Sequence, residues 1–188
     1  TGGGATRMGR DKAVLTVGGE TLADRGARVL SAVCDDAVEA GPGHTGLRAV
    51  VENPPGAGPA AALVAAADAL DTDSVLLLAV DMPFVEERLL ELLRDHPAEG
   101  TVVPEVDTQL QVACCRYSTE AVGWAREVCA TRLGSADPFD TPGLRDVVRH
   151  AAYTVVGSEE WGMVADPRSF ADLDTPDDVR RHGLDGHR

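Results

Sequence analysis

The first twelve residues combine glycine with positive charge in a way that suits phosphate binding. They read TGGGATRMGRDK, with cations at Arg7, Arg10 and Lys12 and a glycine run at Gly2, Gly3 and Gly4. Glycine lets backbone N–H groups approach an anion, and the cations neutralise its charge. The segment therefore predicts a phosphate cradle. The alternative is a glycine-rich terminus whose cations are solvated.

The spacing excludes two common phosphate loops. Gly4 and Gly9 have the separation of a Walker loop, but Arg10 follows them where a lysine is required. A dinucleotide fingerprint would place its third glycine at Arg7. A phosphate loop of another kind is expected.

A candidate metal ligand, Asp81, stands directly after the apolar run Ser74–Val80. A continuous apolar run of this length suits a central strand that is buried on both faces. Ligands of such sheets bind at the carboxyl ends of the strands, and Mg²⁺ on phosphates typically uses one or two carboxylates. Asp81 therefore stands where a metal ligand at a phosphate site is expected. The alternative is a cap on the helix expected over Val85–Arg94.

The pattern GGxxxRMGxDK closely resembles the signature loop of nucleotidyltransferases related to molybdenum cofactor guanylyltransferase. Val80–Phe84 similarly resembles the VDMPF segment of that family, in which the aspartate binds Mg²⁺. The resemblance implies that the glycines line the nucleotide and that Arg7 and Lys12 hold its triphosphate. Arg10 matches no position with a known role and is expected to be a surface cation.

Three further segments are similar to the same family. Gly58–Leu63 resembles GPLAGL with Ala62 in place of a glycine, which implies a nucleotide-binding role for Gly58. Glu52-Asn53 aligns with a segment whose aspartate helps to recognise guanine. Asn53 offers one acceptor oxygen and one donor amide, so the choice of base stays open. Phe170–Pro176 resembles the family's C-terminal segment, whose Thr-Pro caps a helix and whose preceding acid, Asp174 here, approaches the metal in some relatives.

The acceptor half of the chain matches the family less closely. Gln109–Arg116 resembles a strand near the acceptor substrate, and Arg145 is either a contact to the acceptor's phosphate or one half of a surface ion pair with a neighbouring aspartate. Cys114 and Cys115 are expected to be core thiols rather than nucleophiles.

Apolar periodicity predicts alternating strands and helices. Helices are expected over Thr21–Val33, Ala60–Leu70, Val85–Arg94, Ser118–Leu133 and Pro142–His150, and a short one after Thr175. Strands are expected over Ala13–Val17, Leu47–Glu52, Ser74–Val80, Thr101–Val103, Leu110–Arg116 and Ala152–Val156. This order favours a three-layer, Rossmann-like α/β nucleotidyltransferase fold, with a mainly parallel sheet and helices on both faces. A single domain over 1–188 is expected. Since a glycine-rich phosphate loop normally follows a strand, a first apolar strand is expected upstream of Thr1.

Composition narrows the partners. The formal net charge is −14, which opposes binding to nucleic acid or to an anionic membrane surface. The four cysteines form no CxxC pair, which favours a reduced, cytoplasmic protein without structural zinc. Three of the 17 cations still gather in the glycine loop, and this suits one mononucleotide.

The resemblance implies a Mg²⁺-dependent transfer of GMP from GTP onto the terminal phosphate of molybdopterin or its molybdenum form, with release of pyrophosphate. Arg7, Lys12 and Asp81 would carry this chemistry. Two alternatives stay open. One is a cytidylyltransferase of the same pathway or a transferase for another small phosphate acceptor. The other is a catalytically degenerate relative that binds nucleotide.

Overall fold

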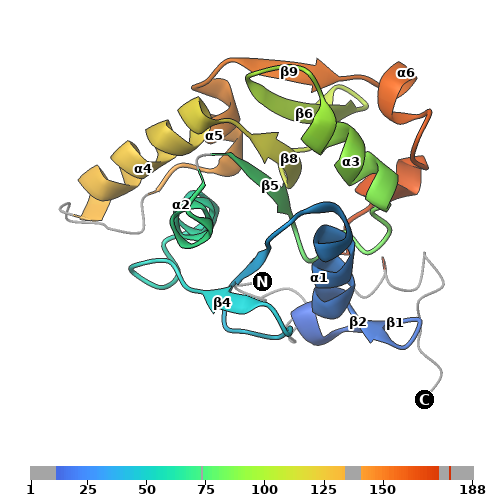
Figure 1. Ribbon diagram of the computed structural model, residues 1–188, viewed down its shortest axis with the longest axis horizontal. Helices are drawn as coiled ribbons and strands as arrows, with labels where there is room; N and C mark the ends of the chain where they lie inside the picture. The colour runs from blue at the N-terminus through green and yellow to red at the C-terminus, as the bar shows by residue number, and fades with distance from the viewer. Residues whose placement is uncertain (1–11, 73, 134–140, 174–177, 179–188) are drawn as a thin grey trace.

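The computed structural model describes residues 12–72, 74–133, 141–173 and 178 (Figure 1). The elements in chain order are η1 (Lys12–Val14), β1 (Thr16–Val17), β2 (Glu20–Thr21), α1 (Leu22–Val33), β3 (Val38–Ala40), β4 (Arg48–Val50), α2 (Pro59–Leu70), β5 (Val75–Leu78), α3 (Glu87–Asp95), β6 (Thr101–Val106), β7 (Gln109–Leu110), β8 (Cys114–Tyr117), α4 (Thr119–Leu133), α5 (Leu144–Arg149), β9 (Tyr153–Val156), α6 (Ser158–Trp161) and η2 (Pro167–Phe170).

Local sequence explains where the main helices begin and end. Thr21 caps α1 by accepting a hydrogen bond from the backbone N–H of Asp24 at 3.0 Å. Pro59 occupies the first turn of α2, where a missing N–H costs nothing, and Asp71 ends that helix in the left-handed conformation. The predicted helices over Thr21–Val33 and Ala60–Leu70 are therefore confirmed.

The central sheet has the strand order β5-β8-β6-β7, and β9 also pairs with β6. β6 and β9 are parallel, whereas β8 is antiparallel to both β5 and β6. Three strands thus point the same way, but β8 lies between two of them and makes most of the ladders antiparallel. The expectation of a mainly parallel sheet is corrected to this extent.

A tight turn after β6 is the reason for the antiparallel ladders. Asp107 and Thr108 both have positive φ, 48° and 65°, as a two-residue hairpin turn requires. The turn reverses the chain into β7, so the single strand predicted over Leu110–Arg116 is wrong. The structure has two short strands there, and the second, β8, inserts beside β5.

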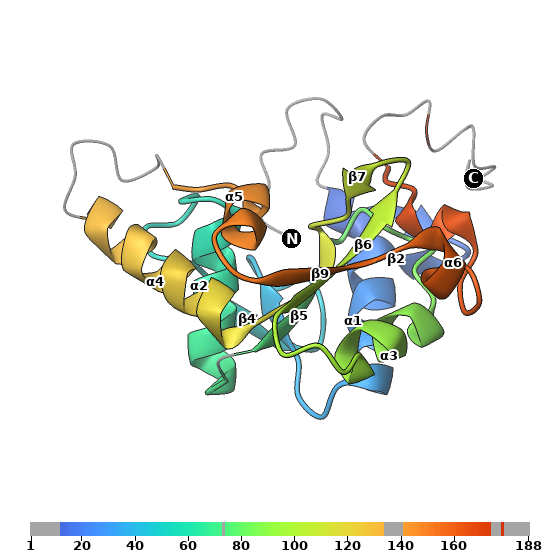
Figure 2. The same cartoon turned by 90° about the horizontal axis from the view of Figure 1, so that it is seen from above.

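Two apolar cores lie on opposite faces of this sheet (Figure 2). Val103 and Cys115 belong to the core built with α2, α4 and α5, whereas Val102 and Cys114 belong to the core built with α1, α3 and α6. Adjacent residues of a strand point to opposite faces, so this alternation shows that both faces are covered. The α/β class and the helices on both faces are confirmed.

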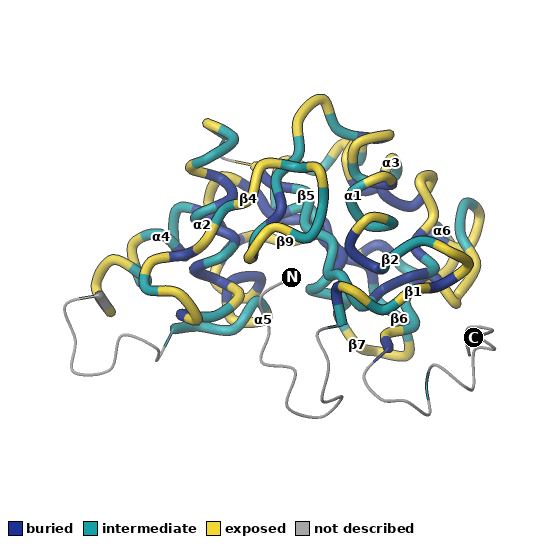
Figure 3. The backbone as a smooth tube through the Cα atoms, turned by 90° about the horizontal axis from the view of Figure 1, so that it is seen from below, coloured by how far each residue is buried: buried dark blue, intermediate teal, exposed yellow. Residues whose placement is uncertain are grey.

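A second, smaller pair of parallel strands, β3 and β4, lies beyond β5 (Figures 1 and 3). β3 was not predicted, because Val38–Ala40 is only three residues long and has Glu39 at its centre. The buried Glu39 carboxylate accepts hydrogen bonds from the N–H groups of His44 and Thr45 at 2.8 Å each, and so orders the turn between the two strands.

Two helix predictions need separate mention. Pro142 does not begin α5, because Gly143 is the N-cap and the helix starts at Leu144. The helix expected after Thr175, with its Thr-Pro cap, lies outside the described residues.

Candidate functional site

An ion pair joins two of the predicted site residues across 69 positions of sequence. Lys12 Nζ donates to Asp81 Oδ2 at 3.0 Å, and the two side chains are 21% and 26% exposed. Asp81 lies just past the carboxyl end of β5, at the edge of the sheet where ligands of α/β proteins bind. The structure therefore brings together the end of the glycine-rich segment and the predicted metal ligand.

The chain around Lys12 is fixed by its neighbours. Ala13 is fully buried, and the N–H of Leu15 donates to the Lys12 carbonyl at 3.0 Å. The next turn is the β1–β2 hairpin, closed by a bond of 2.8 Å from the N–H of Leu22 to the carbonyl of Leu15. This short structured segment gives Lys12 a defined position, whereas Gly2, Gly3, Gly4, Arg7 and Arg10 lie outside the described residues.

The C-terminal segment that resembles the family, Phe170–Pro176, contacts Asp81 through Leu173. The backbone N–H of Leu173 donates to the carbonyl of Asp81 at 2.9 Å, and the Leu173 side chain is fully buried. It packs with Val17, Leu22 and Val80 in a small core beneath the site. Asp174, the next residue and a predicted approach to the metal, is outside the described part of the chain.

The loop from Glu52 to Gly58 forms another wall of the site. Glu52 is only 8% exposed, and its Oε1 accepts from the N–H of Gly56 at 2.8 Å. Gly58 has φ of +98°, and the Thr141 hydroxyl donates to the neighbouring Ala57 carbonyl. These bonds hold the loop against the start of α2.

The structure places Glu52 and Asn53 in different surroundings. Asn53 is exposed and precedes a cis peptide bond to Pro54, whereas Glu52 is buried and lines the groove. The nucleotide contact predicted for Asn53 stays a prediction, and the buried Glu52 is a second candidate from the same dipeptide.

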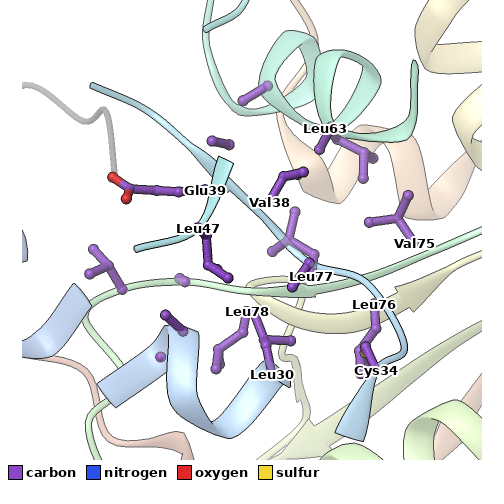
Figure 4. A pocket seen from close by; sticks show the side chains of 18 of the residues that line it. Leu30, Cys34, Val38, Glu39, Leu47, Leu63, Val75, Leu76, Leu77 and Leu78 are labelled. Atoms are coloured by element: carbon purple, nitrogen blue, oxygen red, sulfur yellow. The ribbon is translucent and has the colours of Figure 1, made fainter. Parts of the chain in front are cut away.

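A groove of about 1370 Å³ includes this site in its wall. Lys12, Glu52, Gly58 and Asp81 are among its lining residues, and the rest of its wall is mostly aliphatic (Figure 4). A ligand at the polar end would meet one ammonium, two carboxylates and the glycine-containing turn that opens α2.

The residues singled out in the acceptor half of the chain lie in three different settings. Arg116 lines the groove, but its guanidinium donates to the carbonyls of Arg94 and His96 at 2.9 Å each, which fixes the chain between α3 and β6. Arg145 is exposed on α5. Cys114 and Cys115 are fully buried, and burial raises the pKa of Cys114 to about 12, so the prediction of core thiols is confirmed.

The donor set matches a metal that is shared with a substrate. Within the ranges the structure describes, no group of three or more His, Cys, Asp or Glu side chains gathers to hold an ion. Mg²⁺ usually binds through one or two carboxylates together with substrate phosphates and water. Asp81 fits that mode, because Lys12 engages one of its two carboxylate oxygens.

The three-layer α/β fold, with an ammonium–carboxylate pair at a strand's carboxyl end, is the arrangement of a nucleotide-binding transferase. The chain matches the MobA-like NTP transferase domain over residues 1–156, and it belongs to that family. The predicted class, a nucleotidyltransferase, is confirmed by this membership.

Relatives of known name cover most of the chain. A probable molybdenum cofactor guanylyltransferase of Natronomonas pharaonis is 30% identical, over 96% of this chain and 92% of that protein. One from Synechococcus elongatus is 36% identical, over 77% of each.

Solved structures agree at the level of the fold. Molybdopterin-guanine dinucleotide biosynthesis protein A from Archaeoglobus fulgidus aligns with a TM-score of 0.66 at 18% identity, over 96% of this chain and 92% of that one. A nucleotidyl transferase from Methanothermobacter aligns with a TM-score of 0.63 at 18% identity, over 96% and 91% of the two chains. Among the helices that the structure describes, none has the length and apolarity to cross a membrane.

Proposed function

We propose that this protein transfers GMP from GTP onto the terminal phosphate of molybdopterin, with Mg²⁺ as cofactor. The observation that carries the proposal is the Lys12–Asp81 pair at the carboxyl end of β5. It joins two motifs of a nucleotidyltransferase family at one edge of the sheet. The names of the relatives, probable molybdenum cofactor guanylyltransferases, support the choice of substrates.

The reaction needs no protein nucleophile. An oxygen of the acceptor's phosphate, already an anion at neutral pH, forms a bond to the α-phosphorus of GTP. The bond between that phosphorus and the bridging oxygen to the β-phosphorus breaks, and pyrophosphate leaves with the electron pair. The protein contributes by positioning the two substrates and by neutralising charge, as in other phosphoryl transfers.

Each described residue has a defined task in this scheme. The Lys12 ammonium would bind triphosphate oxygens as a point charge, and the Asp81 carboxylate would hold the cation as well as Lys12. Bound Mg²⁺ supplies neutralisation of the phosphate charge in the transition state. The predicted contacts of Arg7 and the glycines to the triphosphate add to this set.

Glu52 is the better candidate than Asn53 for reading the base. Its buried carboxylate lines the groove, and a carboxylate accepts hydrogen bonds from the two donors that guanine presents, N1–H and the exocyclic amine. Cytosine presents only one donor group there, its amine. This difference favours GTP over CTP.

Pyrophosphate release from Mg-GTP and molybdopterin tests the reaction. Asp81→Asn keeps the shape of the side chain but removes its charge, so turnover should fall at least about a hundredfold. The matched control is Asp68→Asn, because Asp68 is an exposed aspartate that also pairs with a cation, Arg126, at 2.8 Å. A near-normal rate in Asp81→Asn, or no pyrophosphate from the unaltered protein with any nucleotide, contradicts the proposal. The second result favours a degenerate nucleotide-binding relative.

Thermal shift tests the choice of base, since a ligand that binds the folded state raises its melting temperature. Mg-GTP should raise the melting temperature more than Mg-CTP does. Glu52→Gln keeps an oxygen for the Gly56 N–H but loses the negative charge, so the difference should shrink. A larger shift with Mg-CTP in the unaltered protein would identify a cytidylyltransferase instead.

A further inference from the structure

The strand β9 forms one edge of the central sheet. Among the strands that the structure describes it pairs with β6 alone, in parallel and over Thr101–Pro104. It runs along the outside of the molecule, with α5 at one end and α6 at the other (Figures 1 and 2). An edge strand presents N–H and C=O groups on which another strand can pair. The sheet can therefore be extended from this side.

The ladder with β6 determines which residues of β9 offer these groups. The N–H of Thr101 donates to the carbonyl of Ala152 at 3.0 Å. Backbone groups alternate between the two sides of a strand, so Thr154 also bonds toward β6. Tyr153 and Val155 therefore direct their N–H and C=O groups outward, away from the sheet.

The edge lacks the features that normally keep an edge strand single. Natural edges are protected by charged side chains, proline, bulges or a covering element. The sequence of β9, Tyr-Thr-Val-Val, contains neither a charge nor a proline, and its register with β6 is continuous. Tyr153 and Val155 are 45% and 41% exposed, and they lie on one face of the strand because they are two residues apart. The edge is thus apolar as well as open.

Opposite charges stand at the two ends of this edge. α5, which leads into β9, carries the exposed cations Arg145 and Arg149. Two acids at that end, Asp146 and Glu120, already accept hydrogen bonds from backbone N–H groups. At the other end of β9 a hollow of about 680 Å³ is lined by three acidic residues, Glu105, Asp107 and Glu159. The edge therefore has a basic end and an acidic end.

We propose that β9 pairs antiparallel with β9 of a second copy of this chain. In a two-fold arrangement centred on Thr154, Tyr153 lies opposite the partner's Val155, and Val155 lies opposite the partner's Tyr153. Residues of such a pair point their backbone groups at one another, so each pair exchanges two hydrogen bonds. The pairing also sets an aromatic side chain beside a β-branched one, which is a favourable cross-strand combination.

The charges favour a second copy over an unrelated partner. Antiparallel pairing reverses one strand, so the basic end of each β9 lies beside the acidic end of the other. The arginines of α5 then face the acidic hollow of the other copy, and the contact occurs twice because a two-fold interface is self-complementary. Charge complementarity of this kind steers association and fixes the register. The proposal is independent of the substrates, since β9 and β5 are at opposite sides of the sheet and Asp81 follows β5.

Sedimentation velocity at submillimolar protein concentration tests the association. The unaltered chain should sediment with twice the mass of one copy. Val155→Lys should weaken this association at least about tenfold, because a lysine on an edge strand opposes pairing. The matched control is Val51→Lys, since Val51 is 52% exposed and follows β4, on the other side of the molecule from β9. That variant should dimerise like the unaltered chain.

Two results of this experiment overturn the proposal. One is a monomer in the unaltered chain, and the other is a dimer that persists in Val155→Lys. Circular dichroism of each variant separates loss of pairing from loss of folding. If Val155→Lys does not fold, the cross-linking of a smaller substitution decides.

Cysteine cross-linking tests the register. Thr154 lies opposite the partner's Thr154 as a pair without mutual hydrogen bonds, whose Cα atoms are about 4.5 Å apart. This separation permits a disulfide, whereas Val155 and the partner's Val155 are diagonal neighbours about 7–8 Å apart. In a chain with Cys34 and Cys129 replaced by serine, Thr154→Cys should form a disulfide-linked dimer on mild oxidation. Val155→Cys in the same chain should do so at least about tenfold more slowly. Equal cross-linking of the two variants, or none with either, overturns the pairing centred on Thr154.

Discussion

At the scale of single residues, the Lys12–Asp81 pair places an ammonium beside a carboxylate, just past the carboxyl end of β5. Both side chains are about one quarter exposed, so the pair contributes little to stability, since ion pairs in contact with solvent are typically worth about 0–1 kcal/mol. Its value lies in holding an ammonium and a carboxylate ready at the groove's polar end. Under the proposed function, a triphosphate with its cation would bind between these two groups.

Lys12→Met should weaken Mg-GTP binding at least about tenfold, because a phosphate-binding charge is lost while the aliphatic stem remains. The melting temperature without nucleotide should change by no more than about 2 °C. Titration calorimetry and differential scanning fluorimetry provide the two measurements. Arg126→Met is the matched control, since it removes the exposed pair with Asp68 and should leave nucleotide affinity unchanged. If Lys12→Met and Arg126→Met bind Mg-GTP with equal affinity, Lys12 does not contact the nucleotide.

The thiols should divide into two classes in native alkylation with iodoacetamide at pH 8. Burial raises the pKa of Cys114 to about 12, and it also raises that of Cys115, so neither forms the reactive thiolate. Cys34 and Cys129 are only half-buried and should react, slowly because their pKa values are raised as well. Mass spectrometry should find two labels on native protein and four after denaturation. Early labelling of Cys114 would contradict the burial of β8.

At the scale of elements, Gly123 inside a helix and Gly58 in a turn differ in whether alanine can replace them. Gly123 lies inside α4 with ordinary helical geometry, and a Cβ there would meet no atom within 4 Å. Gly58 caps α2 with φ of +98°, and a Cβ there would lie 3.0 Å from Thr141 Oγ1. The same chemical change should therefore have opposite effects at the two positions.

Gly123→Ala should raise the free energy of unfolding by about 0.5–1 kcal/mol through better helix propensity. Gly58→Ala should lower it by about 1–3 kcal/mol, because alanine is strained at positive φ. Urea denaturation followed by circular dichroism measures both. A stabilising Gly58→Ala would show that the turn before α2 does not have the described conformation.

At the scale of the whole molecule, two cores share one central sheet. Leu63 of α2 and Leu93 of α3 are fully buried, one in each core. The sheet between them should couple their layers into one cooperative unit, as the single-domain prediction requires. The strands of that sheet contribute to both cores at once.

Leu63→Ala and Leu93→Ala should each cost about 2–5 kcal/mol, and the double variant should show the sum to within about 0.5 kcal/mol. Equilibrium unfolding in urea should give one transition in every case. Two separated transitions would mean that the layers unfold independently. If the double variant is unfolded in buffer, Val substitutions at the same positions give the smaller changes needed for the comparison.

The sequence alone determined the class of fold and the two ends of the site's polar pair. Long apolar periodicity defined α1, α2, α4 and β5, since burial of a continuous stripe or run depends on local spacing. Distinctive motifs identified Lys12 and Asp81 because their chemistry requires particular residue types. These features depend on local sequence, and the structure contains them as predicted.

Only the tertiary structure decided which of two adjacent residues faces the groove and how the strands pair. Glu52 is buried and lines the groove, and the loop that follows it is held by the local bond from the Gly56 N–H and by the distant Thr141 hydroxyl. β8 inserts against β5 because a two-residue turn reverses the chain, and no periodicity encodes that partner.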